Sequence, residues 1–277
     1  MISPEDKEKI KGLLDKEMNE REQEIICAFR IEAVNAGKTP NYAFFKAPHC
    51  APFGKHPDEY KFENGMSWFK KMDKVYAVSR IDGEAMCDEE MSILIQPGQK
   101  VAFDILIPHS PLTKKRAEKL SRWDFEKHLS ACRDFWLEKL DSAAKIAVPE
   151  MAIDKRIKAG LLHCDLATLG FEPDGPALAT IGWYSPIGTE SAPIIQFFDS
   201  MGWHKLAERS IQFFLERQLE SGFIQNFANY QSETGPLLWT AGEHFRYTRD
   251  TAWLMRVMPK LKKAAAYLLD WRERNKR

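Results

Sequence analysis

The fold of the C-terminal half is decided by a short segment, YSPIGTESAP at residues 184–193, and by the apolar pattern that follows it. Apolar residues recur there at three- and four-residue steps, which predicts helices over residues 190–201 and 203–219. Gly202 separates the two helices, and glycine is the residue most often found just beyond a helix C-terminus. The segment therefore predicts an αα-hairpin.

A second hairpin repeats this arrangement further along the chain. Helical periodicity covers residues 235–247 and 250–272, with Asp250 at a helix start, where a short acidic side chain caps backbone N–H groups. Acidic and aromatic side chains lie at the same end of both hairpins. They are Glu190 with Trp183 and Tyr184 in the first hairpin, and Glu233 with Trp239 in the second. Repeated αα units of this kind predict a helical toroid with a polar, aromatic-lined end.

The N-terminal half has a different period. A charged helix is expected from residue 4 to about residue 22. Between residues 25 and 107, runs rich in β-branched and aromatic residues alternate with turns such as QPGQ at residues 96–99. Short strands of this kind predict an antiparallel β-sandwich. Helical spacing returns over residues 116–144, which predicts a long linker helix.

These patterns indicate an α+β chain with several domains. We expect a partial β-sandwich domain with its N-terminal helix at residues 1–108, a linker helix at residues 109–148, and a helical domain at residues 149–277. A chain of 277 residues is long enough for this division and for a substantial core.

Composition argues against several classes of partner and site. The 40 basic and 40 acidic residues cancel, so no charge excess favours a nucleic acid or an anionic membrane surface. Five cysteines are scattered without C-x-x-C spacing, which argues against a disulfide framework or a zinc site. The chain starts without an apolar signal region, and no stretch reaches about 18 apolar residues. We therefore expect a soluble, cytoplasmic protein.

Several short motifs between residues 90 and 277 add to the helical pattern. They are PG (97–98) before a strand that ends in IPH (107–109), VPE (148–150) after the linker helix, WYSPIGTESA (183–192), GFIQN (222–226), GPLLW (235–239) and YTRD (247–250). In this order they resemble the six-hairpin (α/α)6-barrel glycoside hydrolases and phosphorylases that carry an N-terminal β-sandwich. The resemblance implies a β-sandwich portion followed by the αα-hairpins of a partial (α/α)6 toroid.

Two departures from that family's pattern bear on this expectation. The family has Arg-Asp where this chain has Thr189-Glu190, so the guanidinium that would grip a terminal sugar is replaced. A closed six-hairpin barrel also needs about twice as many helices as the sequence predicts after Pro149. The resemblance thus implies an incomplete barrel with uncovered apolar flanks, and we expect self-association to cover them.

The resemblance implies cleavage of glycosidic bonds in an oligosaccharide or glycoside, which needs two carboxyl groups beside the bond. The candidate catalytic residues are Glu190 and Glu233. The candidate saccharide-binding residues are Trp183, Tyr184, Asn226, Asn229 and Trp239. Aromatic rings suit the apolar faces of sugars, and amides suit their hydroxyls. Neither a metal nor a cofactor is implied.

Each candidate also has a purely structural explanation. Glu190 and Glu233 both lie near a helix start, where the helix dipole favours an acidic residue. Trp239 lies in an apolar stripe that suits a core residue, and loop polarity explains the two asparagines. Three hypotheses stay open: a glycoside hydrolase or part of one, a sugar-binding protein without turnover, and a helical interaction or scaffold module.

Overall fold

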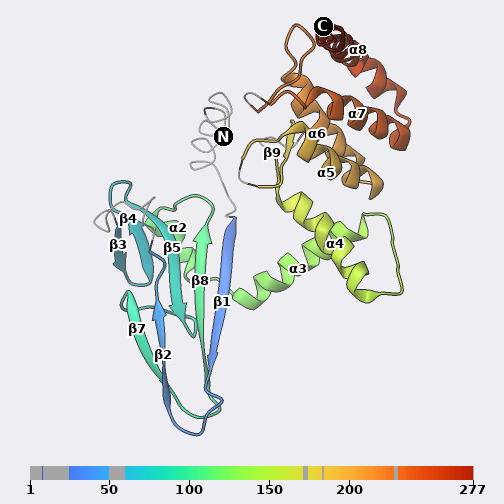
Figure 1. Ribbon diagram of the computed structural model, residues 1–277. Coiled ribbons are helices and arrows are strands. Elements are labelled where there is room, and N and C mark those ends of the chain that lie inside the picture. The colour runs from blue at the N-terminus through green and yellow to red at the C-terminus, as the bar shows by residue number, and fades with distance from the viewer. Residues whose placement is uncertain are drawn as a thin grey trace. The chain divides into compact units, whose positions relative to one another are not determined.

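A computed structural model of the chain describes residues 8, 25–49, 60–170, 174–182, 184–227 and 230–276. These residues combine helices with antiparallel sheets (Figure 1), which confirms the predicted α+β class. The chain divides into two compact units after Ser130, which lies in helix α3 (Phe125–Asp141). We call the described residues from 25 to 130 the β unit, and those from 131 onward, with which residue 8 is grouped, the helical unit. The N-terminal helix predicted up to residue 22 lies outside the described residues, apart from helical residue 8.

The β unit contains two antiparallel sheets. Its strands are β1 (Ile26–Val34), β2 (Asn41–Lys46), β3 (Tyr60–Glu63), β4 (Met66–Phe69), β5 (Lys74–Ile81), β6 (Glu84–Ala85), β7 (Glu90–Ile95) and β8 (Lys100–Pro108). The larger sheet has the order β1-β8-β5-β4-β3, and β6 pairs with β5. Strands β2 and β7 form a separate pair. The predicted strand content between residues 25 and 107 is therefore confirmed among the described residues.

Strand β8 contributes to two apolar cores, because successive side chains of a strand point to opposite faces. On one face, Phe103 packs against Phe45 of β2, with ring centroids 5.2 Å apart. On the other face, Leu106 packs with Val78 of β5 and with Leu120 of helix α2 (Lys114–Leu120). The larger sheet is thus covered by the β2–β7 pair on one side and by α2 on the other.

An ion cluster is buried in the second of these cores. The Asp104 side chain is 1% exposed, and its two oxygens accept hydrogen bonds from Arg30 Nε and Arg80 Nη2, both at 2.7 Å. Burial alone would raise the pKa of Asp104, but the hydrogen bonds and positive charges of the two arginines outweigh burial. They hold the pKa of Asp104 below its usual value.

The linker segment differs from its prediction. The sequence predicts one helix over residues 116–144, but the structure has α2 and α3 with a break between them. Arg80 Nη1 donates to the carbonyl oxygens of Ser121 and Trp123, at 3.1 Å and 2.6 Å, inside that break. In a continuous helix those carbonyls would accept hydrogen bonds from N–H groups four residues later. A buried arginine of β5 therefore stabilises a break that local periodicity does not show.

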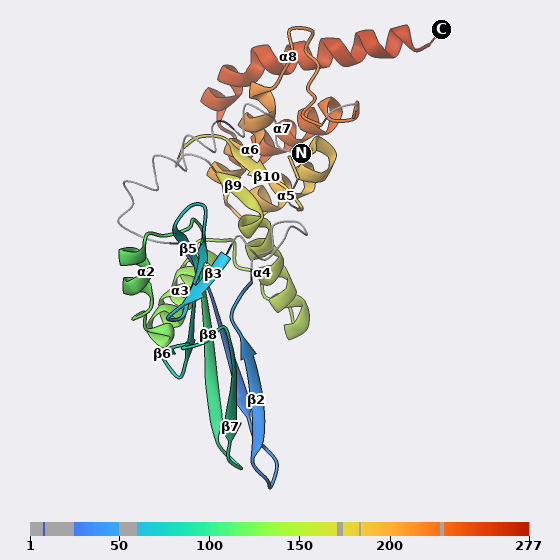
Figure 2. The ribbon, with the colours of Figure 1, turned by 90° about the vertical axis from the view of Figure 1, so that its left-hand side faces the viewer.

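The helical unit confirms the two predicted αα-hairpins. It contains α4 (Met151–Leu166), the short strand pair β9 (Thr168–Gly170) and β10 (Ala177–Ala179), α5 (Gly188–Ser200), α6 (His204–Glu216), α7 (Thr234–Thr248) and α8 (Thr251–Arg274). Asp250 caps α8 as predicted, because its carboxylate accepts a hydrogen bond from Trp253 N at 2.9 Å. Figure 2 shows the C-terminal end of α8 extending away from the other helices of the unit.

One apolar core joins these helices. Phe198 of α5, Phe214 of α6, Leu237 of α7 and Trp253 of α8 are all buried in it. Such burial supplies most of a helix pair's stability, because helix propensity alone is weak. Among the residues that the structure describes, no helix is both long and apolar enough to cross a membrane.

Candidate functional site

The first turns of α5 and α7 are tied together by Glu233, the residue just before α7. Its Oε2 accepts a hydrogen bond from Gly188 N, and its Oε1 accepts hydrogen bonds from Asn226 N and Phe227 N, each at 2.9 Å. The side chain has no exposed surface. Because both oxygens are occupied, Glu233 links the start of α5, the loop before α7 and the start of α7 itself.

Glycine is required where α5 meets this carboxylate. A Cβ atom at position 188 would lie 2.9 Å from the Cβ atom of Glu233 and 3.0 Å from its Cα atom. Real Cβ atoms do not approach other carbons this closely, and neither neighbour is the flexible end of a side chain. The absence of a side chain at Gly188 therefore lets the two helix starts come into contact.

Asn226 fixes the segment that leads into α5. Its Nδ2 donates to Ser185 Oγ and to the carbonyl oxygen of Pro186, both at 2.6 Å. Asn226 is partly buried, and Ser185 is fully buried. The amide that the sequence predicts to bind sugar is thus engaged with the chain itself in this structure.

Glu190 has a different environment from Glu233. It lies in the first turn of α5, is partly exposed, and accepts a hydrogen bond from the Tyr184 hydroxyl at 2.9 Å. That hydrogen bond, together with burial and the carboxylate charge, raises the pKa of Tyr184 above its usual value. Tyr184 therefore stays a neutral donor that orients the Glu190 carboxylate.

The structure brings four predicted residues into one connected site, which we call the α5/α7 end: Tyr184, Glu190, Asn226 and Glu233. Trp239 lies on α7 and is 56% exposed, so the core position is ruled out and its indole is open to solvent. Trp183 and Asn229 lie outside the described residues. The roles predicted for those two residues therefore stay predictions.

A second polar cluster was not identified from the sequence. Asp199 of α5 is buried, and its Oδ1 lies 2.9 Å from Nδ1 of both His204 and His244. The ring of Trp253 packs edge-on against His244, with centroids 4.5 Å apart. The sequence does contain one signal for this cluster, because Asp199 is a charged residue inside an apolar helical stripe. A charged residue in such a position is rarely buried without a partner.

The carboxylates of the α5/α7 end can accept hydrogen bonds from hydroxyl groups, but Glu190 and Glu233 are not equally accessible to a bound molecule. Glu190 has exposed surface and one hydroxyl donor, so it can reach a bound molecule. Glu233 would have to release backbone N–H groups before it could do so. A proton-transfer group must lie within hydrogen-bond reach of its substrate, so this geometry favours a supporting role for Glu233.

Within the described part of the chain, no group of three or more His, Cys, Asp and Glu side chains is arranged to hold a metal ion. In the Asp199 cluster, both histidines turn Nδ1 toward the same carboxylate.

Comparisons with known proteins give no family assignment. No protein-family model matches the chain, and no curated protein is significantly similar to it.

Proposed function

We propose that this chain is a carbohydrate-active protein of the glycoside hydrolase type, and that its α5/α7 end binds a saccharide. The single observation that carries the proposal is the Glu190 carboxylate, partly exposed and oriented by the Tyr184 hydroxyl at 2.9 Å. A fixed carboxylate next to an aromatic ring suits a sugar, which presents hydroxyl donors and apolar ring faces.

The arrangement of the helices supports the partial (α/α)6 toroid in this proposal. Helices α5 and α7 contact each other and run in the same direction, since Glu233 joins their starts and Asp199 pairs with His244 near their ends. Helices α6 and α8 are the return helices of the two hairpins. In the β unit, the two antiparallel sheets with an apolar core between them support a β-sandwich.

In the proposed reaction, water cleaves a glycosidic bond, and one carboxyl group lies on each side of that bond. One group donates a proton to the departing oxygen, and the other accepts a proton from the attacking water. Glu190 is our candidate for one of these roles, and the proposal assigns the second role to no residue. Glu233 keeps the site in place rather than transferring a proton, because three backbone N–H groups occupy its oxygens.

Sugar binding without turnover is a second candidate function. The burial of Glu233 favours this function. Of the two carboxylates that the sequence predicts to be catalytic, Glu233 is buried and Glu190 is partly exposed. Binding and turnover must therefore be measured separately.

The test is an NMR titration of the full chain with maltotriose, cellotriose and xylotriose, followed by a search for anomeric signals of released sugar. We expect shifts of tryptophan indole signals with at least one of the three sugars. Glu190→Gln should weaken that binding about tenfold and leave the fold intact. Glu208→Gln is the matched control, because Glu208 is also a partly exposed helical acid with one side-chain partner, Arg256.

Each outcome distinguishes the candidates. Release of sugar that Glu190→Gln abolishes identifies a glycosidase. Binding that requires Glu190 without release identifies a sugar-binding protein. The absence of shifts with all three sugars at about 10 mM, or equal binding by Glu190→Gln and wild type, rejects the proposal.

A further inference from the structure

The α5/α7 end is built from two stretches of chain that contain no basic residue. Residues 176–203 include β10 and α5, and residues 218–243 include the loop before α7 and the first part of α7. Neither stretch contains Lys, Arg or His, although the whole chain has 40 Lys and Arg residues. Both stretches contain acidic residues, among them Glu190 and Glu233. The side-chain charge that these stretches bring to the site is therefore negative.

Glu190 carries the part of this charge that a ligand can reach. Glu233 has no exposed surface, and backbone N–H groups bind both of its oxygens. Glu190 is partly exposed, and it forms no ion pair with any residue that the structure describes. The Tyr184 hydroxyl donates to it but brings no positive charge. A cationic group on a ligand could therefore bind the Glu190 carboxylate without displacing a cation of the protein.

Two tyrosine side chains are joined to the first turn of α5. Tyr184 donates to Glu190 at 2.9 Å, and Thr189 Oγ1 donates to the hydroxyl of Tyr230 at 3.3 Å. Tyr230 is also held by its backbone, because Gln225 Nε2 donates to its carbonyl oxygen at 3.1 Å. A tyrosine ring interacts favourably with the apolar face of a sugar and with a cation that lies over it. Tyr230 thus adds a second aromatic residue to the site, which the sequence did not single out.

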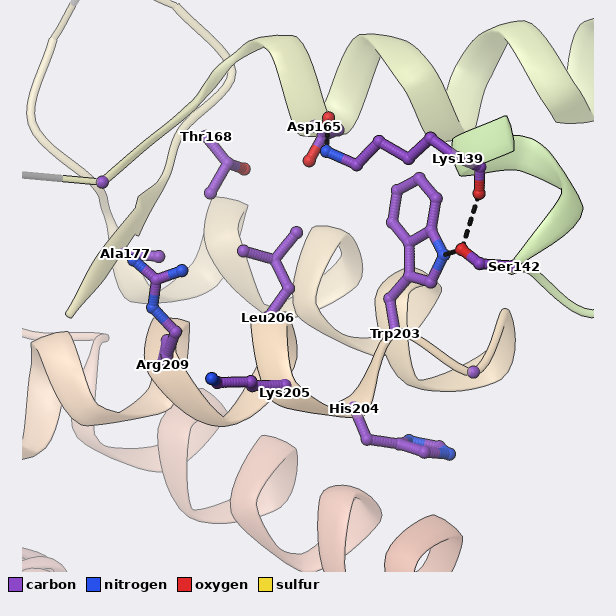
Figure 3. Close-up of a pocket in the computed structure, with 12 residues that line it drawn as sticks. Lys139, Ser142, Asp165, Thr168, Ala177, Trp203, His204, Lys205, Leu206 and Arg209 are labelled. Carbon is purple, nitrogen blue, oxygen red and sulfur yellow. Dashed lines mark hydrogen bonds and ion pairs between the residues drawn. The ribbon is translucent and has the colours of Figure 1, made fainter. Parts of the chain in front are cut away.

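A cavity of about 450 Å³ beside the start of α6 has a different character (Figure 3). Its lining includes three cations, and each of them has a partner: Lys139 pairs with Asp165, Lys205 pairs with Asp174, and Arg209 Nε donates to the carbonyl oxygen of Gly175. None of these partners belongs to the α5/α7 end. The three cations are thus engaged elsewhere in the helical unit and form no ion pair with Glu190.

We propose that the saccharide of the α5/α7 end is an amino sugar, whose ammonium group binds the Glu190 carboxylate. This inference rests on the proposed function, because it names the class of sugar that the same site takes. A charge-assisted hydrogen bond is about twice as strong as a neutral one, so an ammonium group gains more from Glu190 than a hydroxyl does. A sugar that carries a carboxylate or a phosphate is repelled by the same charge.

The experiment is isothermal titration calorimetry of the full chain with cellotriose and with its amino analogue, the glucosamine trimer of chitosan. The two trimers differ only at C2 of each ring, which carries a hydroxyl group in one and an amino group in the other. The pH is kept slightly acidic so that the amine is protonated. We expect the glucosamine trimer to bind about fivefold more tightly than cellotriose at low salt. This ratio should fall toward one at about 1 M salt, because salt screens the charges.

Two variants and a third ligand test the role of the carboxylate. Glu190→Gln keeps hydrogen-bonding capacity but loses the charge, so the two trimers should bind this variant equally. Glu208→Gln is the matched control and should keep the wild-type ratio, since Glu208 is a partly exposed helical acid outside the site, paired with Arg256. Trilysine has three ammonium side chains and no sugar ring, so it should bind wild type more weakly than the glucosamine trimer does.

The outcomes separate this inference from the proposed function. Cellotriose that binds as tightly as the glucosamine trimer overturns the inference and leaves saccharide binding in place, and so does binding of a neutral trisaccharide when the glucosamine trimer does not bind. Folded Glu190→Gln that keeps the preference, or trilysine that binds as tightly as the glucosamine trimer, also overturns it. If no neutral trisaccharide binds, the proposed function and the inference fail together. The comparison of the two trimers on wild type needs no variant, so it remains decisive if circular dichroism shows Glu190→Gln to be unfolded.

Discussion

The Glu233 carboxylate accepts a hydrogen bond from the Gly188 N–H at 2.9 Å, so the residue before α7 holds the first residue of α5. Near the other end of the same two helices, Asp199 lies 2.9 Å from His244 Nδ1. These two buried contacts fix the direction and register of α5 against α7. The side chains at the α5/α7 end depend on that register for their positions.

Gly188→Ala should destabilise the helical unit. The added Cβ would lie 2.9 Å from the Cβ of Glu233, so one helix start must move or the Glu233 hydrogen bond must lengthen. We expect a loss of about 1–3 kcal/mol in the free energy of unfolding, the usual cost of overpacking. Urea denaturation followed by tryptophan fluorescence measures it.

Gly235→Ala is the control for that change. Gly235 lies in the first turn of α7, and among the described residues no atom apart from its chain neighbours and the backbone of its own helix lies within 4 Å of the site of its Cβ. Alanine favours helix over glycine by up to about 1 kcal/mol, so this variant should be as stable as wild type or more stable. Equal losses in both variants would contradict the close approach of α5 and α7.

Glu233→Gln should destabilise the protein more than Glu190→Gln does. A carboxamide presents one acceptor and one donor, so at least one of the three backbone N–H groups at Glu233 loses its partner. An unsatisfied buried donor costs about 1–3 kcal/mol. Glu190 is partly exposed, and its change should cost about 0.5 kcal/mol or less. Chemical denaturation of the two variants gives the comparison, and the reverse order would show that Glu190 is the structural acid.

Asp104 should make the β unit sensitive to acid. Its pKa in the folded protein lies below the unfolded value of about 3.9, so the stabilising contribution is present above that value and lost as the pH falls through the folded pKa. Asp104→Asn should cost about 3–5 kcal/mol at neutral pH, because Arg80 stays buried without its counter-charge. Denaturation curves between neutral pH and about pH 2 should show a shallower acid dependence in this variant than in wild type.

Tyr60 should titrate at unusually high pH. Its hydroxyl donates to Glu89 Oε1 at 2.8 Å, which favours the protonated phenol and raises the pKa of Tyr60 to about 12. Any stabilisation from this pair is therefore complete below the ordinary tyrosine pKa of about 10 and disappears as the pH rises through 12. An ultraviolet tyrosinate titration should show this high step in wild type.

Two variants test whether the titration step at high pH belongs to Tyr60. Tyr60→Phe should remove it, and Glu89→Gln should move it toward the ordinary tyrosine value, because the carboxylate is its main cause. A step near 12 that persists in Tyr60→Phe would assign it to another tyrosine.

The sequence by itself determined the elements whose signals are local. The αα-hairpins follow from three- and four-residue apolar spacing, and Asp250 was identified as a helix start that the structure confirms. Strand runs and the QPGQ turn likewise predicted antiparallel strands before residue 108. These features depend on residues within a few positions of one another, which a single sequence displays directly.

Only the tertiary structure distinguished Glu190 from Glu233. Both are acids beside a helix start, so local chemistry treats them alike. The difference arises because Gly188, 45 positions away, brings its N–H to Glu233, while Glu190 accepts a hydrogen bond from Tyr184, which is close in the sequence. The break between α2 and α3 has the same origin, since Arg80 of a distant strand donates to the carbonyls there. Hydrogen bonds between residues far apart in the chain form only when packing brings their partners together, so no local pattern records them.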